Sequence, residues 1–523
     1  MTNFLRLCAL LLLGGVAQAQ NQAPQLSNVQ PWIVADVGGF SYVLFDVSDA
    51  ENDSIIISLA YSNDNGVTYQ PFPDDAELSG DIGHPIAPGT NKYIGIQNIN
   101  ISTNMFLKIT VHDRQAVDIQ AIVDSVDIER VMADMAFVEG TRHYSANPNH
   151  IAAIKDTIYN RFEAANLNVV RQAFTVGSFT DAENIVGTQT GNGLEQDVVI
   201  VDAHFDTVDD APGADDNGTG VLGLLETVRV LAPYHFERSL QYIGFDLEEL
   251  GLLGSLNFVA NDIPAQNNIV GVLNYEMIGY YTEEPNTQAV PAGFNILYPD
   301  LYAQLQADEF RGNFLINIAN IDSNPLRMLF DSCAAAYVPA LKVMSLAIPG
   351  NGEIAPDFRR SDHAPFWDTD RQALMLTDGA NFRNPYYHTP NDLALSINYD
   401  FLVNNIKATV ATAATLARPL HATVATAPFM VGGSVGDVLG AGCRLHASPN
   451  PAKERLHVSW VDCTAKQVPQ YLMLHDSNGK QVRRVVPALG SNSIDIDIVG
   501  LPQGIYYLST PTAQQRQTIM IQP

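Results

Sequence analysis

The stretch Val198-Val-Ile-Val, which runs on into Asp202-Ala-His204-Phe-Asp206, decides the fold class. Four consecutive β-branched residues indicate a strand that is buried on both faces, and such strands belong to parallel sheets covered by helices on each side. In an open α/β sheet the ligand site lies beyond the carboxyl ends of the strands. The stretch therefore predicts an α/β domain with polar site residues at His204 and Asp206.

Three further apolar runs repeat this pattern, at residues 240–245, 269–273 and 373–376. They lead into Glu248 and Glu249, into Glu276, and, after a loop, into His388. Segments with helical spacing, such as residues 151–165 and 399–417, alternate with the runs. We therefore expect residues 128–420 to form a mostly parallel sheet with helices on both faces. The Gly-rich loop 213–220 adds Asp216 to the same edge.

All-β segments flank this domain. Residues 20–127 contain β-branched and aromatic runs separated by turn clusters, which predicts a fibronectin- or immunoglobulin-like β-sandwich. Residues 421–442 are rich in Gly, Ala and Thr and are expected to be a linker. Residues 443–523 alternate again like strands, with a turn signal at Asn478-Gly479, and predict a second, small β-sandwich.

The N-terminus has the pattern of a signal peptide over residues 1–19. Arg6 precedes the apolar run 7–16, and Ala17-Gln18-Ala19 is a small-x-small cleavage site, so an exported mature chain beginning at Gln20 is expected. No other run approaches the roughly 18 apolar residues of a transmembrane helix. Removal of the signal leaves Cys333, Cys443 and Cys463, and whether Cys443 and Cys463 pair stays open.

The chain is strongly acidic, with 28 Lys+Arg against 57 Asp+Glu and a formal net charge of −29. Because such a charge repels phosphate groups, nucleic acids and anionic membranes are excluded as expected partners.

The polar residues at the strand ends suit a pair of divalent metals. Imidazole and carboxylate ligands without thiols favour Zn²⁺. Two imidazoles and three carboxylates carry a formal charge of −3, which nearly balances two zinc ions of total charge +4. The candidate ligands are His204, Asp216, Glu249, Glu276 and His388. Glu248 is the remaining acid, free to take a proton from metal-activated water. An alternative is that Glu276 pairs with Arg359 or Arg360, which leaves a single-metal site.

Residues 184–418 resemble the secreted co-catalytic zinc aminopeptidases, in the superfamily of glutamate carboxypeptidase and glutaminyl cyclase. The matching motifs are Asn184-Ile-Val-Gly-Thr, His204-Phe-Asp206, Gly213-Ala-Asp-Asp-Asn-Gly-Thr-Gly220, Glu248-Glu249-x-Gly-x-x-Gly-Ser255, Asn274-Tyr-Glu-Met-Ile-Gly279, Ser361-Asp-His-Ala-Pro-Phe366 and Tyr387-His-Thr-Pro-Asn-Asp392. One departure is Glu276, since the best-known members carry Asp there.

The resemblance implies a role for each site residue. Asp206 orients the His204 ring, Asp216 bridges the metals, and Glu248 is the general base. Tyr387 donates a hydrogen bond to the oxyanion, while Asp362 and His363 lie at the rim of the site.

The C-terminal segment resembles the sorting domain of type IX secretion. The residues concerned are Ser448-Pro-Asn-Pro-Ala452, Asp476-Ser-Asn-Gly-Lys480, Leu501-Pro-Gln-Gly-Ile-Tyr506 and the final Ile519-Met-Ile. The resemblance implies the secretion machinery as a partner and an extracellular or cell-surface location. A carbohydrate-binding or adhesive β-module is the alternative.

Together these features predict a secreted aminopeptidase that hydrolyses N-terminal peptide bonds of peptides or proteins with two zinc ions. The alternatives are a single-zinc glutaminyl cyclase-like acyltransferase, a carboxypeptidase or dipeptidase, and an inactive adhesion or binding protein. Side-chain preference, the role of the N-terminal β-domain and the oligomeric state stay open at this point.

Overall fold

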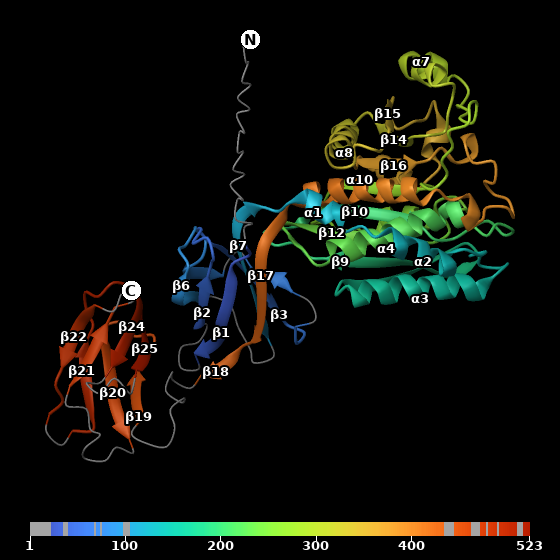
Figure 1. Cartoon of the computed structure of the whole chain (residues 1–523). Coiled ribbons are helices and arrows are strands. Elements are labelled where there is room, and N and C mark those ends of the chain that lie inside the picture. The colour runs from blue at the N-terminus through green and yellow to red at the C-terminus, as the bar shows by residue number, and fades with distance from the viewer. Residues whose placement is uncertain are drawn as a thin grey trace, which may run out of the picture. The chain divides into compact units, whose positions relative to one another are not determined.

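The computed structural model describes residues 22–34, 40–66, 69–73, 76–97, 105–432, 444–461, 471–476, 480–488, 491–509 and 516–522 (Figure 1). The predicted signal peptide, Cys443, Cys463 and the Asn478-Gly479 turn lie outside these residues. The chain divides into two compact units, one formed by residues 116–420 and the other by the segments on either side of it.

The central unit contains an eight-stranded sheet with the order β15-β14-β16-β13-β10-β12-β9-β8. The pairs β10/β12, β10/β13, β13/β16 and β14/β15 are parallel, while β9 pairs antiparallel with both β8 and β12, and β14 with β16. The predicted mostly parallel sheet is thus confirmed. The strands are β8 (Asn168–Val176), β9 (Phe179–Gln189), β10 (Leu194–His204), β12 (Arg238–Phe245), β13 (Asn268–Glu276), β14 (Leu315–Asn320), β15 (Val343–Ile348) and β16 (Ala373–Thr377).

Helices cover both faces of this sheet, because successive side chains of a strand point to opposite faces. In β10, Val199 and Val201 pack on one face, with α1 (Ile119–Asp124), α2 (Ile128–Val138), α3 (Pro148–Ala164), α4 (Gly220–Leu231), α8 (Asn324–Tyr337) and α10 (Tyr399–Ala417). Val198 and Ile200 pack on the other face, with η2 (Phe258–Asp262), α6 (Phe294–Leu297), α7 (Pro299–Ala307), η3 (Pro356–Arg359) and α9 (Ala364–Trp367). Both faces of the run Val198–Val201 are therefore apolar core, as the sequence predicted.

Short segments complete the central unit. They are α5 (Leu253–Asn257), η1 (Ala214–Thr219), η4 (Ala380–Phe382), η5 (Ala394–Ser396) and β11 (His235–Phe236). The unit starts earlier than the predicted residue 128, because Ile122 and Val123 of α1 are buried in the same core as α10. No helix among the described residues is long and apolar enough to span a membrane.

The flanking unit begins with two sheets in the orders β18-β1-β2-β6-β5 and β17-β7-β3-β4. Their strands are β1 (Gln25–Val34), β2 (Phe40–Ser48), β3 (Ile56–Ser62), β4 (Gln70–Pro71), β5 (Glu77–Gly80), β6 (Gly89–Gln97), β7 (Phe106–Ala116), β17 (Pro419–Pro428) and β18 (Met430–Gly432). Phe429 is 2% exposed in their shared core. The prediction of a linker from residue 421 is therefore wrong up to residue 432, because these apolar and β-branched residues complete the two sheets.

The C-terminal segment forms two antiparallel sheets, in the orders β19-β20-β23 and β22-β21-β24-β25. The strands are β19 (Arg444–Ser448), β20 (Arg455–Val461), β21 (Leu472–His475), β22 (Gln481–Val485), β23 (Ser493–Asp497), β24 (Gly504–Ser509) and β25 (Arg516–Ile521). Side chains such as Leu456, Leu474 and Leu508 fill a core of their own. This arrangement matches the small all-β domain predicted there.

Candidate metal centre

The site lies where the parallel strands of the central sheet end. His204 is the last residue of β10 and Glu276 is the last residue of the neighbouring β13. Asp216 comes from the loop before α4, while Glu248 and Glu249 follow β12. The register of a parallel sheet brings these strand ends to one edge, as the sequence predicted.

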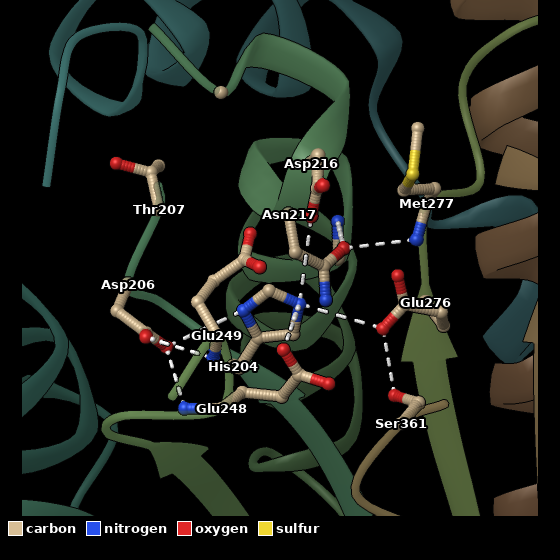
Figure 2. A network of polar contacts seen from close by, with 12 residues as sticks. His204, Asp206, Thr207, Asp216, Asn217, Glu248, Glu249, Glu276, Met277 and Ser361 are labelled. Atoms are coloured by element: carbon tan, nitrogen blue, oxygen red, sulfur yellow. Dashed lines mark hydrogen bonds and ion pairs between the residues drawn. The ribbon is translucent and has the colours of Figure 1, made fainter. Parts of the chain in front are cut away.

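The first group consists of His204, Asp216 and Glu276 (Figure 2). The His204 Nε2 atom lies 3.6 Å from Asp216 Oδ1 and 3.4 Å from Glu276 Oε2. All three side chains are buried. Ser361 donates a hydrogen bond of 2.7 Å to Glu276 Oε2, which fixes the carboxylate of this longer side chain.

The second group consists of Asp216, Glu249 and His388. The His388 Nε2 atom lies 3.1 Å from Asp216 Oδ2 and 3.1 Å from Glu249 Oε2. Asp216 thus faces the first group with one carboxylate oxygen and the second group with the other. This is the arrangement that a carboxylate bridging two metals requires. His388 is the most exposed member, with 32% of its side chain accessible.

The donor atoms of both groups fit a divalent cation. The Nε2 atoms of His204 and His388 and the Oε1 atom of Glu249 are buried and make no hydrogen bond. Unpaired buried polar atoms are costly, and ligation satisfies them. In each group the candidate ligand atoms lie within 4.8 Å of one another. Imidazole and carboxylate are ligands that zinc accepts.

The pKa values of Glu249 and His388 show that the site favours bound protons or cations. Burial, and after it the charge of Asp216, raises the pKa of Glu249 to about 7. Burial alone lowers the pKa of His388, but the adjacent Asp216 and Glu249 outweigh it and raise that pKa to about 10. The crowded carboxylates are therefore compensated by protons or by metal ions.

Two further carboxylates hold the loops that carry the groups. Asp206 Oδ1 accepts from the Glu248 N–H at 3.0 Å and lies 3.4 Å from His204 Nδ1, while its Oδ2 accepts from the Glu249 N–H at 3.1 Å. The two oxygens of Asp392 accept from the N–H groups of Asp215 and Asp216 at 3.0 Å each. Asp206 was predicted to orient His204, whereas no sequence signal assigned this contact to Asp392.

Asn217 fixes the loop against β13. Its Nδ2 atom donates to the Tyr275 carbonyl at 2.8 Å, and its Oδ1 atom accepts from the Met277 N–H at 3.0 Å. The peptide bond between Asp216 and Asn217 is cis.

Glu248 and Tyr387 lie beside the two groups. The Glu248 carboxylate is buried, with Oε2 3.9 Å from His204 Nε2. Burial and the neighbouring acids Glu249 and Glu276 raise the pKa of Glu248 well above its ordinary value, against the opposing effect of His204. The Tyr387 ring stacks on the His388 ring at 3.8 Å. Burial raises the Tyr387 pKa, so the phenol stays protonated at neutral pH.

A pocket opens next to Tyr387 and Glu276. Most of its lining is apolar, including Phe294, Leu305, Phe314, Ile318, Met344 and Met375. At its edge Arg360 Nη2 donates to the Tyr387 hydroxyl oxygen at 2.7 Å. The pocket therefore suits an apolar side chain placed beside the candidate metal groups.

Two expectations for this region require correction. Asp362 and His363 were expected at the rim, but both are fully buried. The His363 Nε2 atom contacts the Phe358 carbonyl at 2.9 Å, and burial lowers its pKa to about 3, so this ring is neutral. The two residues directly precede α9, and the His363 ring packs edge-on against Trp367 of that helix.

The alternative partner for Glu276 is not found either. Arg359 pairs with Asp368 at 2.6 Å, and Arg360 donates to Asn381 and Tyr387. Glu276 instead belongs to the group with His204 and Asp216.

Two sequence profiles and several known proteins match parts of this chain. The sequence profile described as "Peptidase family M28" matches residues 184–413, and that of the "Secretion system C-terminal sorting domain" matches residues 447–522. An uncharacterized protein of Escherichia coli, YfbL, is 32% identical over 214 residues, which are 39% of this chain and 62% of that protein. Aminopeptidase YwaD of Bacillus subtilis is 28% identical over 223 residues, which are 40% of this chain and 39% of that protein. The chain thus spans less than two thirds of these curated relatives.

Solved structures also resemble this chain. The LapA aminopeptidase of Legionella pneumophila has a TM-score of 0.45 at 20% identity, covering 58% of this chain and 74% of that one. The glutaminyl cyclase of Porphyromonas gingivalis has a TM-score of 0.40 at 16% identity, covering 55% of this chain and 96% of that one.

Proposed function

We propose, from the match of residues 184–413 to the profile of peptidase family M28, that the protein is a secreted dizinc aminopeptidase that hydrolyses N-terminal peptide bonds. The observation that supports this most directly is the pair of three-residue groups sharing Asp216. One zinc ion is proposed to bind His204, Asp216 and Glu276, and the other Asp216, Glu249 and His388. A single-zinc cyclase needs only one such group, so two complete groups favour the peptidase.

The residues around the two groups support a hydrolytic mechanism. When bound, the two zinc ions supply water activation and polarisation of the scissile carbonyl. Glu248 takes a proton on its carboxylate and passes it to the leaving amine. Tyr387 donates its phenolic hydrogen to the carbonyl oxygen as that oxygen gains negative charge. Because Arg360 already donates to the phenol oxygen, the hydrogen of Tyr387 is left free for the substrate.

We expect activity only on substrates with a free N-terminal amine and an apolar first residue. The acids of the site attract an α-ammonium, and the apolar pocket beside Glu276 and Tyr387 receives the first side chain. The measurement is a panel of aminoacyl-nitroanilides carrying Leu, Phe, Met, Lys or Glu, each free and N-acetylated. The Leu, Phe and Met substrates are expected to be fastest.

The contrary outcomes are measured with the same panel extended by unblocked peptides, one of them with N-terminal Gln. Equal rates on free and acetylated substrates exclude the aminopeptidase. Cleavage only from the carboxyl end of unblocked peptides indicates a carboxypeptidase instead, and formation of pyroglutamate from N-terminal Gln indicates a cyclase.

The C-terminal domain is proposed to direct export. Residues 447–522 belong to the sorting domains of a secretion system, which indicates release to the cell surface or exterior. The signal peptide over residues 1–19 is proposed to direct the first step. The partner implied is the secretion machinery.

Deleting residues 443–523 is expected to leave hydrolysis unchanged and to abolish delivery to the cell surface and medium. The domain has its own apolar core and contributes no residue to the two metal groups, so its loss leaves the site intact. Immunoblots of cell and medium fractions, with activity assays on lysates, measure both effects. Normal export of the truncated chain contradicts the sorting assignment.

A further inference from the structure

A fully buried arginine holds together the two loops that carry His204 and Asp216. Arg142 lies between α2 and α3, outside the segment that matches the peptidase family. Its exposed fraction is 0%. The guanidinium donates to six main-chain carbonyl oxygens, at 2.6–3.5 Å, and these belong to Val138, Gly140, Phe205, Pro212, Gly213 and Asp216.

Three of these acceptors lie within the candidate metal centre. Phe205 O, at 2.7 Å from Nε, is the carbonyl between His204 and Asp206. Gly213 O and Asp216 O, at 2.9 and 3.5 Å from Nη2, begin and end the loop that presents the Asp216 carboxylate. The planar guanidinium thus connects the loop after His204 with the loop that carries Asp216.

The backbone around Arg142 adds to this connection. Its N–H donates to Thr207 Oγ1 at 2.9 Å, and its carbonyl accepts from the Thr207 N–H at 3.1 Å. The packing is tight, because a Cβ atom at Gly213 would lie 2.8 Å from Arg142 Nη2 and 2.4 Å from Asp216 O. The loop therefore closes directly onto the guanidinium.

The charge of Arg142 is unusual for a residue with a packing role alone. Within the described part of the chain, no carboxylate forms an ion pair with it. Burial lowers its pKa to about 10, opposed by Asp392, Asp216 and Asp206, so the group stays charged at neutral pH. A buried charge is costly, and an apolar side chain of similar volume fills space without that cost. What only Arg provides is a rigid fork of five donors.

We propose that Arg142 is a positioning residue that fixes the separation of His204 and Asp216 and thereby sets the zinc affinity of the site. The proposal rests on the proposed dizinc function. Within the described residues the hydrogen bonds of the guanidinium go to main-chain carbonyls, so it acts through the two ligand loops rather than as a ligand.

The test compares Arg142→Lys and Arg142→Met with wild type in the full chain. Lys keeps the charge but loses the fork, and Met loses both. We expect both variants to bind zinc about 10–100-fold more weakly, the range for residues that orient metal ligands. Zinc affinity is measured by competition with a chromogenic chelator. At saturating zinc we expect kcat to fall and KM to stay near the wild-type value.

The matched control is Arg238→Lys. Arg238 is a largely buried arginine bonded to Asp197 and to the Leu416 carbonyl, but it lies at the amino end of β12, away from the ligands. We expect its zinc affinity to equal that of wild type, although its unfolding temperature falls. The control separates loss of stability from loss of ligand geometry.

Several outcomes overturn the proposal. Wild-type zinc affinity in Arg142→Lys does so, because the charge alone then suffices. This holds even if Arg142→Met binds zinc more weakly. If neither variant folds, Thr207→Val provides the second test. It removes the acceptor of the Arg142 main-chain N–H, which helps to hold Arg142 against the loop after His204, and it keeps the shape of the side chain. Its zinc affinity is expected to fall, and an unchanged value contradicts the proposal. Failure of wild type itself to bind zinc contradicts the proposed function instead.

Discussion

The Glu248→Gln variant is expected to bind both zinc ions and to lose kcat by roughly 10²–10⁴-fold, the contribution typical of a general base. The carboxamide has the shape of the acid but cannot accept the proton. Glu248 lies 3.9 Å from His204 Nε2 without belonging to either ligand group, so metal content is expected to stay at the wild-type value. Steady-state kinetics on a Leu substrate, together with zinc analysis of the same sample, measure both quantities.

Glu284→Gln is the control for this variant, because Glu284 is an exposed acid outside the two groups. It removes the same charge without an expected effect on kcat. Near-normal kcat in fully metallated Glu248→Gln removes Glu248 from the role of base. Loss of zinc from that variant assigns it to the ligands instead.

The Asp216→Ala variant is expected to lose both zinc ions, because Asp216 faces each group with a different oxygen. Activity is expected to fall by several orders of magnitude. The loop itself is held through main-chain atoms, by Asp392 at the Asp216 N–H and by Arg142 at its carbonyl, so the fold is expected to persist. Zinc per chain after dialysis, and circular dichroism, provide the measurements.

Glu276→Ala is the matched comparison, since Glu276 belongs to one group alone. It is expected to lose about one zinc ion and to retain the one held by Asp216, Glu249 and His388. Equal zinc loss in the two variants contradicts the sharing of Asp216. Retention of two zinc ions at wild-type affinity in Glu276→Ala removes Glu276 from the ligands.

The sequence was most informative where chemistry follows a buried strand. The runs before His204, Glu248 and Glu276 have the near-continuous apolar composition typical of buried parallel strands, and parallel register then brings their ends together. The five candidate ligands could therefore be named as a set, and the structure brings all five together in two groups. The sequence around each strand end was sufficient here, because the pairing of the strands in the sheet brings these ends together.

Sequence reasoning failed where contacts are made to main-chain atoms. Arg142 and Asp392 bond to peptide groups, which every residue carries, so no residue type at a fixed spacing indicates their partners. The burial of Asp362 and His363 could likewise not be predicted from the sequence. A polar motif near a site is expected at the surface, whereas burial among Trp367, Phe358 and the ligands depends on packing between distant segments.

The linker was misjudged for a related reason. Residues 421–432 have a composition typical of flexible segments, yet β18 pairs parallel with β1, with Trp32 opposite Met430. Register with a strand almost 400 residues away leaves no trace in the local composition. The apolar run Phe429-Met-Val431, with Phe429 buried in the sandwich core, departs from that composition.

The strands β17 and β18 make the catalytic segment an insertion within the N-terminal sandwich, between β7 and β17. During synthesis the first seven strands must therefore wait for some 300 intervening residues before their last two partners arrive. A gene fragment ending at residue 420 lacks β18 and most of β17, which leaves β1 as an unpaired edge, whereas one ending at residue 432 includes both strands. Proteolysis between residues 433 and 443 removes the sorting domain and spares every described strand of the sandwich.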